Sequence, residues 1–365
     1  MIEIPYIPGD GVGPEVTQSM MRVVNAAMEA CYSEYINWIR CLAGQEALIK
    51  TGSLLPQETI NEISNHIASI KGPLTTPIGN GHRSLNVQLR QMFDLYACVR
   101  PVKYYPGVKS PLIDPHNVNI TVFRENTEDI YAGIEYPVNS PKSLDLQDWI
   151  DKPLNFPSAF ALKPVSIEGS KRLIRSAFEY AKKTGLNHVT LVHKGNIMKH
   201  TEGLFRDCGY EVAKEYPNIR VDDCICDAFM QNAILHPENY DVVATLNLNG
   251  DYISDMLAAL VGGIGISPGA NINYDTGQAI FEATHGTAPS IAARGIVNPC
   301  SCILSSAMLL DYIGYHAAAR LIDDCVAEAI LDGDVTKDLS TNGISLSTTK
   351  FTDIIVQKIK SHAKS

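Results

Sequence analysis

The alternation of short apolar runs with longer helical patterns most constrains how this chain can fold. Residues 2–7, 118–123 and 188–193 are short and rich in β-branched and aliphatic side chains, which is typical of buried strands. After the first run, Pro14 opens a helical pattern with apolar residues along one side. Strands that alternate with helices predict an α/β fold with a largely parallel sheet.

Length and charge exclude several classes of protein. The 365 residues predict two or three domains. The formal charge of −10 and the lack of a Lys/Arg-rich run argue against a nucleic-acid partner. No apolar run approaches the roughly 18 residues of a membrane span, and no secretory leader is visible. The nine cysteines lack C-x-x-C spacing, so we expect reduced thiols in a cytoplasmic protein without a membrane partner.

Two glycine- and proline-rich segments need separate interpretations. Gly9, Gly11 and Gly13 lie between a predicted strand and a predicted helix, as in a dinucleotide fingerprint. Their spacing is G-x-G-x-G instead of G-x-G-x-x-G, so we interpret them as a tight turn that needs no ligand. Residues 136–164 carry five prolines, which predicts a loop-rich arm outside the core.

Three arginines with a serine and an asparagine form the first candidate site. Asn86 and Arg90 share a face if a helix begins near Ser84, and Arg100 and Arg124 belong to apolar runs. Guanidinium groups in this setting can clamp a polycarboxylate through bidentate hydrogen bonds. The alternative is that the arginines form salt bridges with nearby carboxylates: Asp94, Glu125 or Glu128.

A second candidate site combines carboxylates after the predicted strand 241–248. Asp251 and Asp255 are four residues apart, so both point along one helical face. Oxygen ligands of this kind suit Mg²⁺ or Mn²⁺, and Asp227 offers a third. The alternative is that these carboxylates only complement the dipole at a helix N-terminus.

Lys194 and Tyr131 are candidates for proton transfer. Lys194 follows a predicted strand, where α/β sheets place ligands. Tyr131 follows the polar end of another strand. The alternatives are a surface lysine and a half-buried packing residue. The small-residue turn 282–289 has backbone N–H groups that can cradle a phosphate, which is weak evidence for a nucleotide site.

Taken together, these motifs resemble the isocitrate/isopropylmalate dehydrogenase family, the metal-dependent β-decarboxylating dehydrogenases. The resemblance covers nearly the whole chain, and Ser84-Leu85-Asn86 is most similar to the bacterial homodimeric isocitrate dehydrogenases. The motifs that carry it lie in order at residues 8–11, 71–77, 123–126, 131–133, 193–196, 249–255 and 285–289.

The resemblance implies a mixed α/β sheet that is not a true Rossmann fold. It implies a large, cofactor-binding domain over residues 1–95 and 262–365, and a small substrate, metal and dimer domain over 96–128 and 167–261. Residues 129–166 match the family's dimer clasp in position. A homodimer with shared active sites is therefore expected.

The resemblance also implies roles for single residues. Ser84 and Asn86 would bind the γ-carboxylate of isocitrate. Lys194 would accept the hydroxyl proton, and Tyr131 would protonate the enolate that remains after CO₂ is lost. Lys194 and Asp227 would come from the second subunit. The other carboxylates would be bound by Arg90, Arg100 and Arg124, and Mg²⁺ or Mn²⁺ by Asp227, Asp251 and Asp255.

Four positions bear on which cofactor the resemblance implies. NADP-using bacterial relatives carry Lys-Tyr where this chain has Ser290-Ile291, and a later Tyr and Arg where it has Lys337 and Thr341. Most residues that would bind the 2′-phosphate of NADP are missing on this comparison. We therefore expect NAD as the cofactor, with NADP as the alternative. The implied cofactor residues are Thr75, Thr76, His285, Gly286, Thr287, Ala288, Pro289, Ser290, Ile291 and Asn298.

Three further hypotheses remain open. A sibling activity on homoisocitrate or another acidic 3-substituted malate fits the same residues. A non-catalytic regulatory subunit is disfavoured because every matched catalytic position is filled. A phosphoryl group on Ser84 would bring roughly −1.5 to −2 charges into the carboxylate site and repel the substrate.

Overall fold

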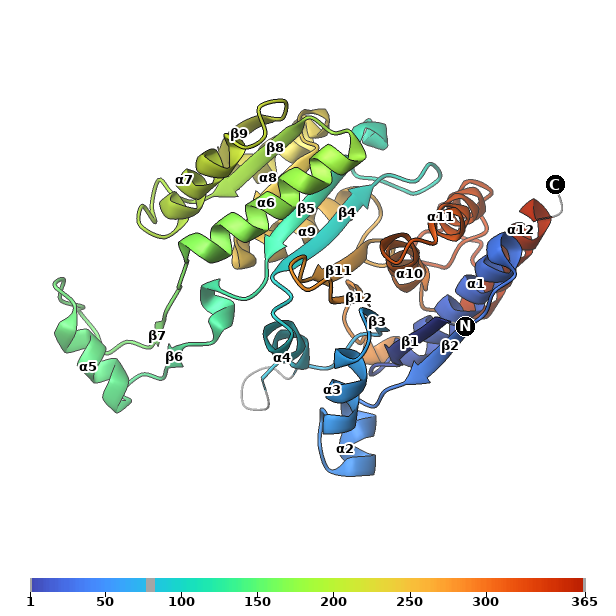
Figure 1. The fold of residues 1–365 in the computed structure, drawn as a ribbon, viewed down its shortest axis with the longest axis horizontal. Helices are drawn as coiled ribbons and strands as arrows, with labels where there is room; N and C mark the ends of the chain where they lie inside the picture. The colour runs from blue at the N-terminus through green and yellow to red at the C-terminus, as the bar shows by residue number, and fades with distance from the viewer. Residues whose placement is uncertain (1, 77–82, 364–365) are drawn as a thin grey trace.

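A single ten-stranded sheet runs through the computed structural model, which describes residues 2–76 and 83–363 (Figure 1). The strand order is β2-β1-β3-β12-β11-β4-β5-β10-β8-β9. The strands are β1 Ile2–Ile7, β2 Ile36–Arg40, β3 Ala68–Lys71, β4 Ala97–Lys103, β5 Asn119–Glu125, β8 His188–His193, β9 Arg220–Ile225, β10 Val242–Thr245, β11 Pro268–Ile272 and β12 Ala279–Ala283.

The sheet consists of two parallel blocks joined by antiparallel strands. Strands β2, β1, β3 and β12 run parallel to one another, as do β5, β10, β8 and β9. Between the blocks, β11 is antiparallel to both β12 and β4, and β4 is antiparallel to β5. The mixed α/β sheet is therefore confirmed, and the largely parallel arrangement holds within each block.

Helices cover both blocks (Figure 1). At the end that carries both termini, α1, α10, α11 and α12 pack together. At the other end, α6 and α9 both pack against β5. The helices are α1 Gly13–Tyr32, α2 Gln45–Thr51, α3 Gln57–Ser64, α4 Leu85–Met92, α5 Pro141–Trp149, α6 Ile167–Thr184, α7 Glu202–Ala213, α8 Cys226–Leu235, α9 Asn247–Leu260, α10 Cys300–Tyr312, α11 His316–Leu331 and α12 Thr348–His362.

The predicted apolar face of the first helix forms part of the main core. Val16, Met20, Val23 and Ala27 of α1 are fully buried. They recur at intervals of three and four residues, so one stripe of the helix faces inward. Burial of these side chains holds α1 against the helices that follow it at the C-terminal end of the chain.

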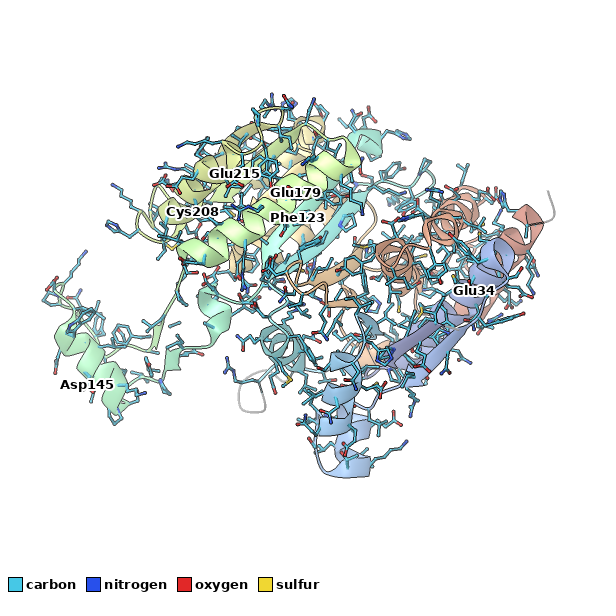
Figure 2. All side chains as sticks on the ribbon, viewed as in Figure 1. Glu34, Phe123, Asp145, Glu179, Cys208 and Glu215 are labelled. Carbon is cyan, nitrogen blue, oxygen red and sulfur yellow. The ribbon has the colours of Figure 1, made fainter. Side chains whose placement is uncertain are left out.

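The proline-rich segment projects from the body as an arm (Figure 1). It contains α5 and a two-stranded ribbon of β6 Glu135–Tyr136 and β7 Phe160–Ala161. Asp145, on α5, is labelled in Figure 2 at the far end of this arm. The expected loop-rich segment thus holds a helix of its own, which begins at a Ser140 cap followed by Pro141.

Three other observations bear on the sequence predictions. The strand predicted over 241–248 is too long, because β10 ends at Thr245 and α9 begins at Asn247. All nine cysteines are free, and most are buried. Within residues 2–76 and 83–363, every helix is too short or too polar to traverse a lipid bilayer.

Candidate active site

The three predicted arginines come together on one side of the sheet. Arg100 on β4 and Arg124 on β5 lie on adjacent antiparallel strands, and Arg124 pairs in register with Cys98. Residues two apart on a strand share a face, so Arg100 and Arg124 point the same way. Arg90 comes from α4, whose N-cap is Ser84, as predicted. All three guanidinium groups are buried.

Arg100 and Arg124 bind residues of α9, and neither binds the carboxylates offered as alternatives. Arg124 Nε donates to Asn247 Oδ1 at 2.9 Å, and Arg124 also pairs with Asp251. Arg100 Nη1 donates to Ser254 Oγ at 2.6 Å and lies 3.4 Å from Asp255 Oδ1. The alternative that these arginines form salt bridges with Asp94, Glu125 or Glu128 is therefore wrong. Those carboxylates bind other side chains: Asp94 binds Arg172, Glu125 binds Thr127, and Glu128 binds Ser166.

Arg90 belongs to a buried charge network that the sequence analysis missed. Arg90 Nη2 lies 2.6 Å from one carboxylate oxygen of Glu282, and Lys71 Nζ lies 2.5 Å from the other. Asn271 Nδ2 donates to Glu282 Oε1 at 2.8 Å. The two cations outweigh the burial that would raise the pKa of Glu282, so this pKa is well below its usual range. The sequence offered one signal, because Glu282 is the first residue of the predicted nucleotide turn 282–289.

Several polar atoms in this region are buried without a protein partner. Arg90 Nε, Arg100 Nε and Asn86 Oδ1 make no hydrogen bond to any other described residue. Leaving a buried polar group unpaired is costly, and more so when the group is charged. Two buried guanidinium N–H groups without a partner among the described residues are therefore suited to an anionic ligand.

Tyr131 lies in the same site. Its hydroxyl donates to Asp251 Oδ2 at 2.7 Å, and its ring lies 4.9 Å from the Arg124 guanidinium carbon. Burial raises the pKa of Tyr131 to about 12, although the positive charge of Arg124 acts to lower this pKa. The phenol is therefore protonated at neutral pH and can donate a proton.

Asp251 and Asp255 lie one turn apart on α9, as predicted. They are beyond the first turn of the helix, which contains no acidic residue. The helix-dipole alternative is therefore wrong. Burial opposes ionisation of Asp251, but the charges of Arg124 and Arg100 and the hydrogen bond from Tyr131 together outweigh it and lower the pKa of that carboxyl. Burial raises the pKa of Asp255.

Asp227 is brought together with Lys194, not with the other two aspartates. It lies in the first turn of α8, where its carboxylate pairs with Lys194 Nζ. The hydrogen bond from Lys194 lowers the pKa of Asp227. Across the described part of the chain, no three His, Cys, Asp or Glu side chains are gathered closely enough to hold a metal ion.

Two of the predicted cofactor residues, Thr75 and Thr287, contact the glycine turn. The Asp10 carboxylate accepts from the backbone N–H groups of Gln45 and Thr75, both at 2.9 Å, and Val12 N donates to Thr287 O at 3.0 Å. A Cβ on Gly11, whose φ is +58°, would lie 2.0 Å from the same Thr287 oxygen. The turn is thus explained by close packing within the chain, as predicted.

The remaining cofactor candidates line the segment after β12. His285 Nδ1 lies 2.9 Å from Gly286 O, and its Nε2 is buried without a hydrogen-bond partner among the described residues. Burial lowers the pKa of His285. Ala288 adopts a left-handed conformation with φ of 39° and is followed by the short 3₁₀ turn Pro289–Ile291.

Three further predicted positions complete the region. Asn298 is buried, and its Nδ2 donates to Asp338 Oδ2 at 2.9 Å. Thr76 Oγ1 donates to Ser84 Oγ at 3.1 Å, which joins the predicted cofactor and substrate residues. Pro77, the last residue of the 71–77 motif, lies outside the described residues.

The comparison with protein families agrees with this geometry. Residues 3–355 match the isocitrate/isopropylmalate dehydrogenase model. The chain belongs to this family. The isocitrate dehydrogenase (NADP) of Streptococcus salivarius is 52% identical over 97% of this chain and 94% of its own. The enzyme of the same name from Staphylococcus aureus strain Mu50 is 45% identical over 98% of this chain and 95% of its own.

A solved structure of this dehydrogenase family has the same fold. The isocitrate dehydrogenase from Methylococcus capsulatus has a TM-score of 0.88 and 42% identity, over 99% of this chain and 100% of that one. Because 42% of the aligned residues are identical, the likeness extends beyond the fold to the sequence.

The predicted NAD preference is corrected by these relatives, because the similar enzymes are named for NADP. The prediction relied on the absence of particular side chains at four positions. A phosphate needs cations and donors but no single set of residues. Arg294 and Lys337 are both exposed, and Arg294 Nη1 lies 3.4 Å from Ser290 O. Arg294 and Lys337 are therefore cations that could bind a phosphate, and the expectation of NAD gave them too little weight.

Proposed function

We propose that this protein oxidises isocitrate with NADP and releases CO₂ and 2-oxoglutarate. The observation that carries the proposal is the cluster of Arg90, Arg100 and Arg124, buried beside Asp251 and Asp255. Buried cations whose N–H groups find no partner in the described part of the chain suit a substrate with several carboxylates. The similar enzymes named isocitrate dehydrogenase support the choice of substrate.

Ser84 and Asn86 would distinguish isocitrate from substrates with an apolar substituent. Ser84 caps α4 and accepts from Val87 N at 3.4 Å, so its hydroxyl is held at the start of the helix. The buried Asn86 Oδ1 has no hydrogen-bond partner among the residues that the structure describes, and turning the amide would offer its N–H₂ group instead. An apolar group placed there would leave both polar side chains unsatisfied.

The donor set of Asp251 and Asp255 fits a divalent ion. Mg²⁺ is commonly held by one or two carboxylates, with substrate oxygens and water completing the shell. Bound Mg²⁺ or Mn²⁺ would supply Lewis-acid polarisation of the substrate oxygens. Arg124 and Tyr131 orient Asp251 for this role, since both are bonded to its carboxylate.

Proton transfer is assigned to two side chains. Lys194, hydrogen-bonded to Asp227, would take the proton of the 2-hydroxyl in its neutral amine form, and bound NADP would supply the hydride acceptor. Tyr131 then gives its proton to the carbon from which CO₂ departs. A phenol with a pKa of about 12 remains protonated until this step.

A homodimer is part of the proposal. Asp227 belongs with Asp251 and Asp255 in the expected metal set, yet no such group of three forms within the described residues of one chain. A second copy that contributes Lys194 and Asp227 would complete each site, and closed two-fold dimers are the commonest way to share residues.

An activity matrix tests the function. Isocitrate, homoisocitrate and 3-isopropylmalate are each assayed with NADP and with NAD, with Mn²⁺ and with EDTA. We expect the largest kcat/KM with isocitrate and NADP, and no turnover in EDTA. Larger kcat/KM with another acid, or activity that survives chelation, would contradict the proposal.

A further inference from the structure

A large cavity lies on the face of the sheet opposite the candidate active site. Its volume is about 950 Å³, at the upper end of the range for pockets that enclose small ligands. It is lined by β4 and β11, by α6 on one side, and by α10 and α11 on the other. Glu179, labelled in Figure 2, lies on α6 along this cavity.

The register of β4 places the cavity and the site back to back. Val99 and Pro101 line the cavity, whereas Arg100 between them binds Ser254 and Asp255 on the other face. Successive side chains of a strand point to opposite faces. The same backbone therefore forms a wall of both spaces.

Two more strands repeat this relationship. On β11, Ile272 lines the cavity, while Asn271 donates to Glu282. On β12, Phe281 lines the cavity, while Glu282 binds Lys71 and Arg90. A change in the spacing of these strands on one face thus alters the positions of charged groups on the other.

The walls are rich in aromatic rings. Tyr96 and Tyr274 lie with ring centroids 6.5 Å apart, and Phe281 and Tyr312 with centroids 5.8 Å apart. Arg172 lies 4.3 Å above the Tyr96 ring. Flat rings of this kind favour a planar aromatic ligand through stacking and edge contacts.

Polar and charged side chains also line the cavity, and two of them carry a buried polar atom without a hydrogen-bond partner among the described residues. Ser267 is 95% buried, and its Oγ makes no hydrogen bond to any other described residue; the same holds for Arg172 Nε. Both cationic and carboxylate side chains occur around the cavity, and Lys103 pairs there with Asp323. Neither sign of charge dominates, which favours an uncharged ligand with a hydrogen-bonding atom.

We propose that this cavity binds an uncharged, planar aromatic molecule and that its occupancy changes the affinity of the active site. Because α6 packs on one block of the sheet and α10 on the other, with α11 packed against α10, such a ligand bridges the two blocks. That the cavity binds such a ligand does not depend on the proposed function. That the bound ligand changes the affinity of the active site rests on the proposed function.

A fluorescence titration tests the binding. N-phenyl-1-naphthylamine, an uncharged probe, should bind the whole protein saturably with one site per chain. Ala307→Phe fills the cavity and Tyr274→Ala removes a wall, so each should weaken binding by about ten-fold or more. Tyr35→Ala, an exposed tyrosine elsewhere, should leave it unchanged. Non-saturable binding, or equal binding by all variants with native circular dichroism, overturns the site.

Two additional measurements define the ligand class and the coupling. The sulfonated analogue 8-anilinonaphthalene-1-sulfonate should bind more weakly, and tighter binding would overturn the uncharged class. Saturating isocitrate with Mn²⁺ should shift the Kd of the uncharged probe, since coupling between two sites is reciprocal. An unchanged Kd in a preparation that oxidises isocitrate overturns the coupling. A preparation without that activity identifies a failure of the proposed function instead.

Discussion

The hydroxyl of Tyr131 donates a hydrogen bond to Asp251 Oδ2 over 2.7 Å. This bond joins the proposed proton donor to the proposed metal ligand before any substrate arrives. Arg124 touches both residues, so the three side chains form one unit between β5, α9 and the 3₁₀ turn Asp129–Ala132.

Replacing Tyr131 by phenylalanine removes the proton donor while preserving the ring that lies beside Arg124. We expect kcat for isocitrate oxidation to fall by about 10²–10⁴-fold, the usual contribution of general acid catalysis. KM for isocitrate should change little. Steady-state kinetics measure both, with Tyr35→Phe as the control on an exposed tyrosine. An unchanged kcat would exclude Tyr131 as the proton donor.

Glu282→Gln leaves Lys71 and Arg90 buried without a carboxylate. We expect the free energy of unfolding to fall by about 3–5 kcal/mol, because the cations lose their compensation. The matched control is Glu46→Gln, whose partners Arg40 and Lys50 are exposed and should contribute about 1 kcal/mol or less. Urea unfolding at neutral pH measures both. Equal losses of unfolding free energy in the two variants would contradict the expectation that the buried ion pairs contribute more than the exposed ones.

Acid should remove the same stabilisation from the unmodified protein. The pKa of Glu282 is lower in the folded chain than its ordinary value of 4.5, mainly because Lys71 and Arg90 outweigh the effect of burial. Its contribution is complete above the unfolded pKa and is lost as pH falls toward the folded value. The stability difference between the unmodified protein and Glu282→Gln should therefore narrow below pH 4.5. Urea unfolding across that range measures it, and a constant difference would contradict the prediction.

Gly11→Ala tests the contact between the glycine turn and the proposed cofactor turn. The new Cβ would lie 2.0 Å from Thr287 O in a backbone with positive φ. We expect a loss of stability of about 1–3 kcal/mol from strain and a higher KM for NADP. Gly333→Ala shares the positive φ but meets no atom within 4 Å, so it isolates the effect of the clash. Identical thermal melts and KM values for the two variants would count against the contact.

Subunit mixing tests the shared site. Lys194→Met and Asp251→Asn should each be inactive alone. After unfolding and refolding together, they should regain about a quarter of the original activity, because half of the dimers are mixed and each holds one intact site. If both residues serve a site within one chain, every site lacks one of them and the mixture stays inactive. Unmodified protein carried through the same refolding corrects for incomplete recovery.

Local patterns in the sequence were sufficient for the secondary elements near the site. The strand at 188–193 and the helix capped by Ser84 follow from side-chain branching and from the serine hydroxyl that bonds to the backbone. The i, i+4 spacing placed Asp251 and Asp255 on one helical face. The start of α9 was missed, because Leu246 and Leu248 continue an apolar run that a strand and a helix accommodate equally well.

By itself, the sequence therefore determined the strand–helix alternation, the family and most of the polar residues around the site, since these depend on short-range patterns. The partners of the arginines and the pairing of Lys71 and Arg90 with Glu282 depended on the tertiary structure, as did the cavity behind β4. Those contacts join residues up to about two hundred positions apart, and the order of strands in the sheet decides which of them meet. Burial of charge then has to be balanced locally, and only the packed structure shows which carboxylate balances which cation.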